Sequence, residues 1–178
     1  MTVSPQSNIK VTTRQIPKWH RIPNTSIQSH PLMIYHGAFD ATSSQLSTCL
    51  EEVGEVVPQW AYTMYSQTHF HSTTHEVLGV VSGRARLCFG GEENPNRFEP
   101  TVQRGDLIIV PAGVGHRLLD DLDRDAEPFK MVGAYPPGKQ WDMCYGQPGE
   151  EDKVKDIRNV AWFKRDPLYG DDGPALRV

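Results

Sequence analysis

Residues 69–79, HFHSTTHEVLG, contain three histidines and a glutamate inside an otherwise apolar, strand-prone stretch. Burying imidazole and carboxylate groups costs free energy unless each group finds a partner. The run therefore predicts one of two arrangements. Either it is an exposed polar strand, or several of its side chains converge on a metal ion whose binding offsets their desolvation.

The alternation of side chains along a strand determines which of these groups can meet. Residues two apart share a face, so His69 and His71 are expected on one face, together with Tyr65 and Gln67. Tyr65 and Gln67 are the candidate catalytic side chains, because either could form a hydrogen bond to a substrate or a bound oxygen. The alternative is that both line a barrel and are satisfied by the backbone.

Glu76 is expected to begin a second strand after a turn through residues 72–74, on the same face as Leu78 and Val80. His75 has the opposite parity and is expected to point away, toward the exterior or an interface. Two imidazoles and one carboxylate are three of the ligands that a divalent transition metal accepts, but three alone could arise by chance.

A fourth candidate ligand lies in residues 105–120, GDLIIVPAGVGHRLLD. Gly105 opens a turn, the run LIIV has the character of a buried strand, and Pro111 and Gly113 shape a second turn. His116 then starts another strand. This order places an isolated histidine beside an apolar strand, where a metal site formed by the first block could use it.

Both blocks resemble the sequence motifs of the cupin superfamily. The first has the spacing His-x-His, four residues, Glu, six residues, Gly, and the second has Gly, five residues, Pro, one, Gly, two, His, three, Asp. The superfamily's second motif usually closes on asparagine, where this chain has Asp120, a position that is not one of the usual ligands. Residues 32–175 are similar to a group of small single-domain cupins of bacteria and fungi.

The resemblance implies that four residues bind one metal inside a jelly-roll barrel: His69, His71, Glu76 and His116. Three imidazoles and one carboxylate suit Fe, Mn, Ni, Co, Cu or Zn, and they leave up to two positions of an octahedron open. The alternative is an inherited jelly-roll core whose histidines are satisfied by hydrogen bonds without a metal.

The rest of the chain predicts an all-β fold, a cupin jelly-roll β-barrel with a short helix and N- and C-terminal extensions. Its 178 residues include 15 Gly and 14 Pro, and short β-like runs from residue 61 to 135 are separated by turn residues. We expect an N-terminal arm over 1–30, one cupin domain over 31–178 with its core barrel at about 61–135, and a hairpin connection at 90–104. The predicted helix contains Leu46 and Leu50 and ends at Gly54.

Composition excludes several classes of partner. The net charge of −4 and the lack of a basic stretch predict no nucleic-acid binding. No apolar run approaches a membrane span, and the start of the chain lacks an apolar signal core, so a cytoplasmic protein without a membrane partner is expected. The odd number of cysteines, three, indicates reduced, packed thiols. A homodimer is expected, with the N-terminal arm or residues 32–36 pairing with a partner strand.

Three functions are compatible with this sequence. The first is a metal-dependent enzyme of the dioxygenase type acting on a small oxygen-rich molecule, with isomerase or decarboxylase chemistry also available at such a centre. The second is a non-catalytic module that binds metal or a small ligand. The third resembles sugar-epimerase cupins, which work without metal through a histidine base. Tyr135, near the end of the last predicted barrel strand, could reach the mouth of the pocket.

Overall fold

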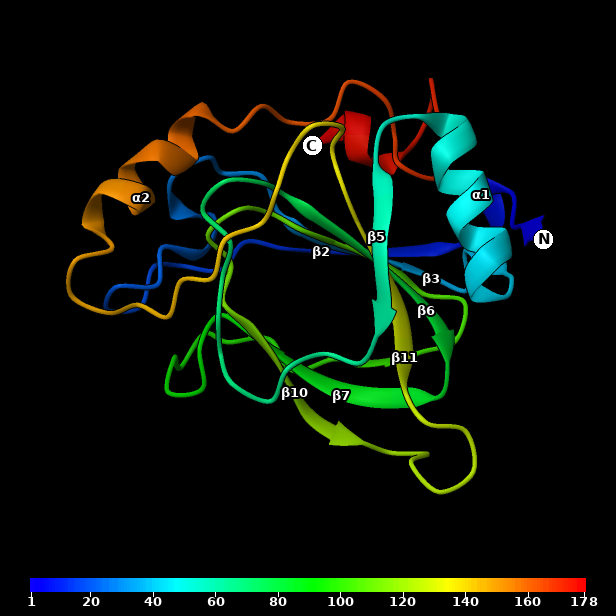
Figure 1. The fold of residues 1–178 in the computed structure, drawn as a ribbon, viewed down its shortest axis with the longest axis horizontal. Coiled ribbons are helices and arrows are strands. Elements are labelled where there is room, and N and C mark those ends of the chain that lie inside the picture. The colour runs from blue at the N-terminus through cyan, green and yellow to red at the C-terminus, as the bar shows by residue number, and fades with distance from the viewer.

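The computed structural model describes residues 1–178, and most of its regular structure is antiparallel sheet (Figure 1). The strands are β1 (Thr2–Val3), β2 (Lys10–Arg14), β3 (Leu32–His36), β4 (Phe39–Asp40), β5 (Val57–Tyr62), β6 (Glu76–Ser82), β7 (Arg84–Phe89), β8 (Thr101–Gln103), β9 (Leu107–Val110), β10 (His116–Asp121) and β11 (Lys130–Tyr135). The helices are α1 (Ser43–Val53) and α2 (Glu151–Asp156), with short 3-10 turns η1 (Gln6–Asn8), η2 (Asn24–Ser26), η3 (Ile157–Asn159) and η4 (Pro174–Arg177).

The strands form two sheets that enclose an apolar core. The larger sheet has the order β2-β3-β9-β6-β11-β5, and the smaller has the order β10-β7-β8. Strands β1 and β4 pair separately at the edge of the molecule. This arrangement confirms the predicted all-β jelly roll, in which strands far apart in the sequence become neighbours.

The larger sheet is buried on both faces, as alternate residues of β9 show. Ile108 and Val110 pack between the two sheets, whereas Leu107 and Ile109 belong to a second apolar layer on the opposite face. Helix α1 and the C-terminal residues 157–178 cover that second layer (Figure 1). Because both faces are covered, the central strands are nearly continuous apolar runs rather than alternating ones.

Helix α1 ends where the sequence predicts, and Thr42 caps its start. The Thr42 side chain accepts a hydrogen bond from the Gln45 amide, and the Gln45 side chain accepts one from the Thr42 amide, which together form a capping box. Gly54 ends the helix in a left-handed conformation, with φ of 78°. Leu46 and Leu50, one turn apart, are the buried residues that dock the helix on the sheet.

Four elements differ from the sequence prediction. Strand β8 lies inside the segment 90–104 that was expected to be a connection, and α2 is a helix in the turn-rich region after residue 136. The predicted arm over 1–30 contains β2, which pairs with β3 along its whole length. Strand β3 therefore has neighbours on both sides, and β2 is the edge strand instead. Strands β2 and β8 and helix α2 are short and largely exposed, so they carry little periodic apolar signal, whereas the neighbours of the buried strand β3 are set by the sheet topology.

Gly133 on β11 lies opposite Trp60 on β5, and a Cβ atom at Gly133 would overlap the indole ring. Gly133→Ala is therefore expected to lower the free energy of unfolding by about 1–3 kcal/mol through overpacking. Urea unfolding measures this loss. In a Trp60→Ala background the same change should cost less than half as much, and an equal cost in both backgrounds would show that the overlap with the indole is not the cause.

The three cysteines are free thiols, as predicted, with Cys88 and Cys144 buried and Cys49 half-buried. Burial raises the pKa of Cys88 to about 11 and that of Cys144 to about 12, so both stay protonated at neutral pH. None of the helices has the length and apolar character needed to cross a membrane.

Candidate metal centre

Three histidines converge inside the sandwich: two come from the segment between β5 and β6, and the third is the first residue of β10. One ring nitrogen from each of His69, His71 and His116 lies within 4.8 Å of the other two, and all three residues are buried. Reciprocal backbone hydrogen bonds join His69 and His116, with N to O distances of 3.2 and 2.8 Å. The carbonyl of His71 accepts a hydrogen bond from the Gly113 amide at 2.8 Å, so the turn of the second motif holds the first motif in place.

The three imidazole rings are oriented by the backbone. Each Nδ1 atom lies within hydrogen-bonding distance of a carbonyl oxygen, and the pairs are His69 with Gln67 at 3.0 Å, His71 with Asp142 at 2.6 Å and His116 with Val114 at 2.9 Å. A carbonyl can only accept, so each Nδ1 atom carries a proton, and in the neutral form of each ring the Nε2 atom carries a free lone pair. This is the state in which histidine binds a metal, with the second ring nitrogen anchored by an outer partner.

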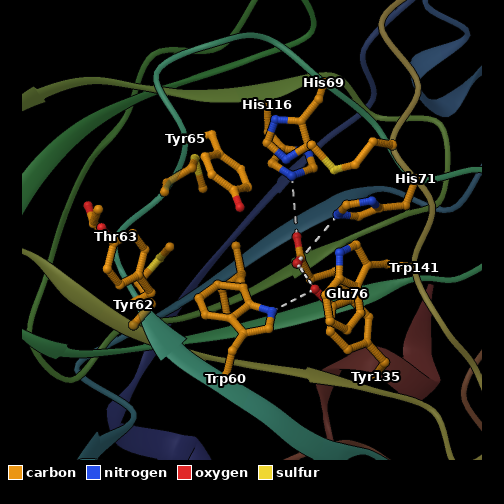
Figure 2. Close-up of a pocket in the computed structure, with 14 residues that line it drawn as sticks. Trp60, Tyr62, Thr63, Tyr65, His69, His71, Glu76, His116, Tyr135 and Trp141 are labelled. Atoms are coloured by element: carbon orange, nitrogen blue, oxygen red, sulfur yellow. Dashed lines mark hydrogen bonds and ion pairs between the residues drawn. The ribbon is translucent and has the colours of Figure 1, made fainter.

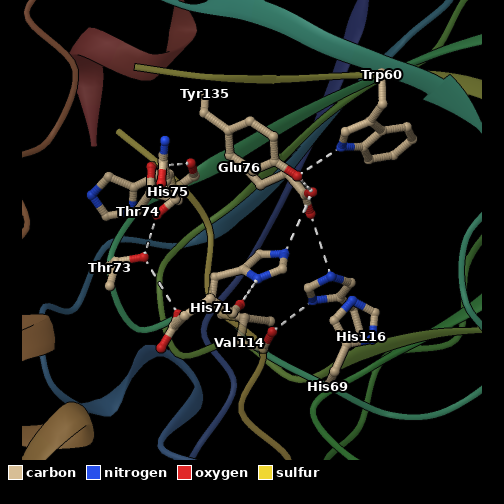
Figure 3. Close-up of polar contacts among 12 residues, drawn as sticks. Trp60, His69, His71, Thr73, Thr74, His75, Glu76, Val114, His116 and Tyr135 are labelled. Atoms are coloured by element: carbon tan, nitrogen blue, oxygen red, sulfur yellow. Dashed lines mark hydrogen bonds and ion pairs between the residues drawn. The ribbon is translucent and has the colours of Figure 1, made fainter. Parts of the chain in front are cut away.

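Glu76 is the first residue of β6 and points to the inner face of the large sheet, as the alternation predicted. Its Oε1 atom lies 3.5 Å from Nε2 of His71, and its Oε2 atom lies 3.3 Å from Nε2 of His116 (Figure 3). Glu76 thus approaches two of the three histidines but lies outside the three-histidine group defined above. Its role as a fourth ligand remains a prediction.

Two buried atoms at this point have no hydrogen-bond partner: Nε2 of His71 and Oε2 of Glu76. Leaving such atoms unsatisfied costs about 1–3 kcal/mol each, more when the group is charged. Both atoms can donate an electron pair to a metal. The first belongs to the histidine cluster, and the second lies beside it. The residues therefore fit a divalent transition metal, which would satisfy all of them at once.

The protonation states suit metal binding at neutral pH. Burial, together with the nearby His116, lowers the pKa of His69 to about 3, so this imidazole is neutral. Burial favours the neutral form of Glu76, but His71 and His116 outweigh it and hold the pKa of that carboxyl well below its usual range. Burial alone would lower the pKa of His71, but the nearby Glu76 carboxylate outweighs this effect and raises that pKa. A bound metal ion would replace the proton that the Glu76 carboxylate stabilises on the His71 imidazole.

Two consecutive hydrogen bonds also orient the Glu76 carboxylate. Tyr135 donates its hydroxyl proton to Glu76 Oε1 at 2.6 Å, and Trp60 donates its indole N–H to the Tyr135 oxygen at 2.8 Å (Figure 2). An indole can only donate and a phenol has a single proton, so the direction of this chain is fixed from Trp60 to Glu76. Oε1 of Glu76 thus accepts a hydrogen bond from Tyr135, whereas Oε2, on the side of His116, has no hydrogen-bond partner.

A cavity of about 270 Å³ opens over the histidine cluster (Figure 2). Nine of its 14 lining residues are hydrophobic, and the whole lining is Trp60, Tyr62, Thr63, Met64, Tyr65, His69, His71, Glu76, Leu78, His116, Met131, Tyr135, Trp141 and Met143. A cavity of this size, with few polar groups in an apolar wall, is typical of a small-molecule site.

The structure separates the two predicted catalytic side chains. Tyr65 lines the cavity with its hydroxyl turned inward, and its ring stands edge-on to His69 at a centroid distance of 5.7 Å (Figure 2). Gln67 lines only a neighbouring outer cavity, to which Tyr65 and Trp141 also contribute, and both predicted side chains are exposed, Tyr65 to 61%. The reason is a bend at Ser66 and Gln67, which interrupts the alternation expected of a continuous strand.

His75 points away from the centre, as predicted, but it is buried rather than exposed. Its Nδ1 atom accepts a hydrogen bond from the Ala112 amide at 3.0 Å, and its ring packs edge-on against Trp162 at 4.8 Å. Burial lowers its pKa to about 4. The C-terminal segment that carries Trp162 covers this position, and no local pattern around His75 indicates that contact.

Trp60 is a site residue that the sequence analysis missed, and Tyr135 was placed only at the mouth of the pocket. Both belong to strands paired in the large sheet, β5 and β11, where Trp60 is level with Gly133. The sequence signal that could have found them is the glycine itself, because a missing side chain in a buried strand indicates close approach of a large neighbour.

Comparisons with known proteins agree with this architecture. Residues 64–138 match the family described as Cupin. A relative from Bacillus subtilis (strain 168), the uncharacterized protein YjlB, is 35% identical over 159 residues, which cover 89% of this chain and 90% of that protein.

Solved structures that align with this chain include vicilin from tomato and an oxalate decarboxylase variant from Bacillus subtilis. The vicilin is 9% identical with a TM-score of 0.37, covering 77% of this chain and 29% of its own. The oxalate decarboxylase is 16% identical with a TM-score of 0.36, covering 79% of this chain and 29% of its own. This chain therefore spans under a third of either structure.

The two motifs and the convergence of His69, His71 and His116 agree with the match over residues 64–138 and with the full-length relative. The chain belongs to the cupin family.

Proposed function

We propose that this protein is a mononuclear metal enzyme that oxidises a small oxygen-rich molecule with O2, in the manner of a dioxygenase. The observation that carries the proposal is the set of three buried histidines, each with one ring nitrogen within 4.8 Å of the other two, beside the Glu76 carboxylate and under a largely apolar cavity. Both oxygen atoms of O2 enter the product in such a reaction, so no external reductant is required.

The residues named above would hold the metal, with Glu76 as the fourth ligand. When bound, a divalent metal with open positions acts as a Lewis acid toward substrate oxygens and, as Fe(II), supplies redox chemistry with O2. A substrate that fills the largely apolar cavity would displace water from it and so strengthen the electrostatic contacts inside. Tyr62, Thr63 and Tyr65 supply hydroxyl donors in the lining, and we assign to Tyr65 the hydrogen bond to a substrate oxygen.

Oxygen uptake tests the proposal directly. Metal-free protein reconstituted with Fe(II), and in parallel with Mn(II), Co(II), Ni(II), Cu(II) or Zn(II), is incubated with simple diketones, catechols and oxo acids in an oxygen electrode. We expect uptake that requires both the metal and one class of substrate, and that is lost in a His71→Ala variant. Stoichiometric metal without turnover of any compound would support a non-catalytic binding module instead.

The reading as a metal-free epimerase is tested in the same assay. Its activity would depend on a histidine base and would survive dialysis against a chelator, whereas a metal enzyme loses activity and regains it when the metal is returned. The arrangement of the three histidines favours the metal enzyme: a histidine base needs a single imidazole, whereas here one ring nitrogen from each of three imidazoles lies within 4.8 Å of the other two, and the Glu76 carboxylate lies beside two of the rings.

A further inference from the structure

Positive charge is concentrated near the start of the chain, on strand β2 and just after it. Residues 1–39 contain four Lys or Arg and no Asp or Glu, although the whole chain has a net charge of −4. Lys10, Arg14 and Lys18 are exposed and form no ion pair, whereas Arg21 lies 3.6 Å from Glu151. A surface with unpaired charges of one sign attracts partners of the opposite sign.

Strand β2 is an end strand of the large sheet, so one of its two backbone edges is unpaired. It pairs with β3 without a register shift over all five residues, from Lys10 opposite His36 to Arg14 opposite Leu32. Alternate residues of an antiparallel strand direct their N–H and C=O groups to opposite edges. The outer edge of β2 therefore presents a row of backbone donors and acceptors to an added strand.

The other end strand of this sheet, β5, is protected against added strands in two ways that β2 is not. It contains Pro58, which has no N–H to donate, and a register shift between Gly133 and Ala134 interrupts its pairing with β11. Proline and bulges are both devices that keep exposed sheet edges from pairing. A third device is charge, which β2 has at Lys10 and Arg14, and charge repels only strands of the same sign.

The side chains of Lys10 and Arg14 lie on the same face of β2. Val11 packs against the apolar layer beneath α1, so residues of the opposite parity point to the other face. The guanidinium carbon of Arg14 lies 4.9 Å from the centre of the Phe98 ring, a cation–π contact that holds this side chain in place. Four residues along a strand separate the two cations by about 13 Å.

This spacing disfavours a second copy of β2 and fits an acidic strand. Two copies paired antiparallel over their full length would place Lys10 of each copy opposite Arg14 of the other, and like charges directly opposite are destabilising. A strand with carboxylates four residues apart would instead place one carboxylate opposite each cation, and such pairs of opposite charge are stabilising.

From these observations we infer that the outer edge of β2 binds an extended segment of a partner protein that carries two acidic residues four positions apart. The segment extends the six-stranded sheet by one strand, with its backbone paired to β2 and its carboxylates beside Lys10 and Arg14. Strand β2 lies at the opposite end of the sheet from β5 and does not line the cavity of the candidate metal centre, so this surface is independent of the proposed function.

Fluorescence anisotropy with labelled peptides tests the preference on the full chain. The probe is a nine-residue peptide with valine at even positions and threonine at odd ones, except for aspartate at the third position and glutamate at the seventh. The control exchanges the glutamate with the valine before it, so that its two acidic residues lie on opposite faces. We expect the probe to bind at least about 5-fold more tightly than the control. Equal affinities, or no binding of the probe below about 1 mM, would overturn the inference.

Charge reversal in the protein gives an independent check. The double variant Lys10→Glu/Arg14→Glu is expected to weaken binding of the probe by at least about 10-fold, and to bind instead a peptide with lysine at the two acidic positions. The matched control Lys155→Glu/Arg158→Glu changes the net charge equally at exposed residues of α2 and η3, and its affinity for the probe should stay within about 2-fold of the wild type. Equal losses in the two variants would show general attraction by net charge and would contradict a site on β2.

Pairing through the backbone is tested with N-methylated probes, because methyl groups on alternate amides block one edge of a peptide at a time. Only one edge of the bound segment faces β2, so we expect one of the two methylated peptides to bind at least about 10-fold more weakly and the other to bind within about 2-fold of the probe. Loss of binding in both peptides, or in neither, would show that the segment is not paired as a strand.

Two other occupants of this edge are outcomes of the same experiments. A single-stranded oligonucleotide that binds more tightly than the probe, and is lost in Lys10→Glu/Arg14→Glu, would identify a surface for nucleic acid instead. Dimerisation of the wild type in sedimentation that is lost in the same variant would identify a second copy of the chain. Either result would overturn the assignment of an acidic strand.

Discussion

His116→Ala is expected to lower the affinity of this protein for a divalent metal by at least about 100-fold, because it removes a ligand that no neighbouring side chain can replace. His116 is the residue that the second motif contributes to the centre, and its ring lies 4.2 Å from that of His69. Competition with a fluorescent chelator measures the affinity of the wild type and the variant.

The control for this variant is His20→Asn, which removes an exposed histidine outside the histidine cluster. It should bind metal as the wild type does. If His116→Ala unfolds, His116→Asn retains a donor near the Val114 carbonyl while lacking the imidazole lone pair. Unchanged metal affinity in a folded His116 variant would remove this residue from the centre.

Tyr135→Phe is expected to weaken metal binding by about 10- to 100-fold, although the residue is not a ligand. The change leaves Glu76 Oε1 without its hydrogen bond at 2.6 Å and leaves the Trp60 indole N–H without an acceptor. The freed carboxylate can then rotate away from His116. A cost of about 1–3 kcal/mol in the free energy of unfolding is also expected, from the unsatisfied buried groups.

Tyr35→Phe is the matched control, because Tyr35 is a buried tyrosine whose hydroxyl donates to another carboxylate, Asp166, at 2.7 Å. Its loss should cost similar stability and leave metal affinity unchanged, since Tyr35 packs in the layer beneath α1. The spectrum of the Co(II)-loaded protein gives a further readout, which should change in Tyr135→Phe alone. Equal effects of both variants on metal affinity would reduce Tyr135 to a structural role.

Local sequence pattern predicted much of the site. The His-x-His spacing and the parity of Glu76 place their side chains where the structure has them, because alternation along an extended chain is a local property. Helix α1 was predictable for the same reason, since its capping box and terminal glycine lie within a few residues of its ends. The convergence of His116 on His69 followed from the family resemblance.

The parts that the sequence did not predict depend on contacts between distant segments. Gln67 does not share a face with Tyr65, because a bend interrupts the expected strand. His75 is buried because Trp162, nearly ninety residues later in the chain, packs against its ring. The chain from Trp60 through Tyr135 to Glu76 exists only because β5 and β6 both pair with β11. Such neighbours are set by sheet topology, and no single stretch of sequence contains that information.

Elemental analysis of the protein purified from its own host tests the central claim most directly. We predict close to one transition-metal ion per chain after extensive dialysis, and less than about a tenth of that in a variant with alanine at positions 69, 71 and 116. The native host matters because a recombinant host can load a different metal according to the order of affinities. A wild-type protein that retains no metal, and takes up none when supplied with each candidate ion, would contradict the assignment of a metal centre.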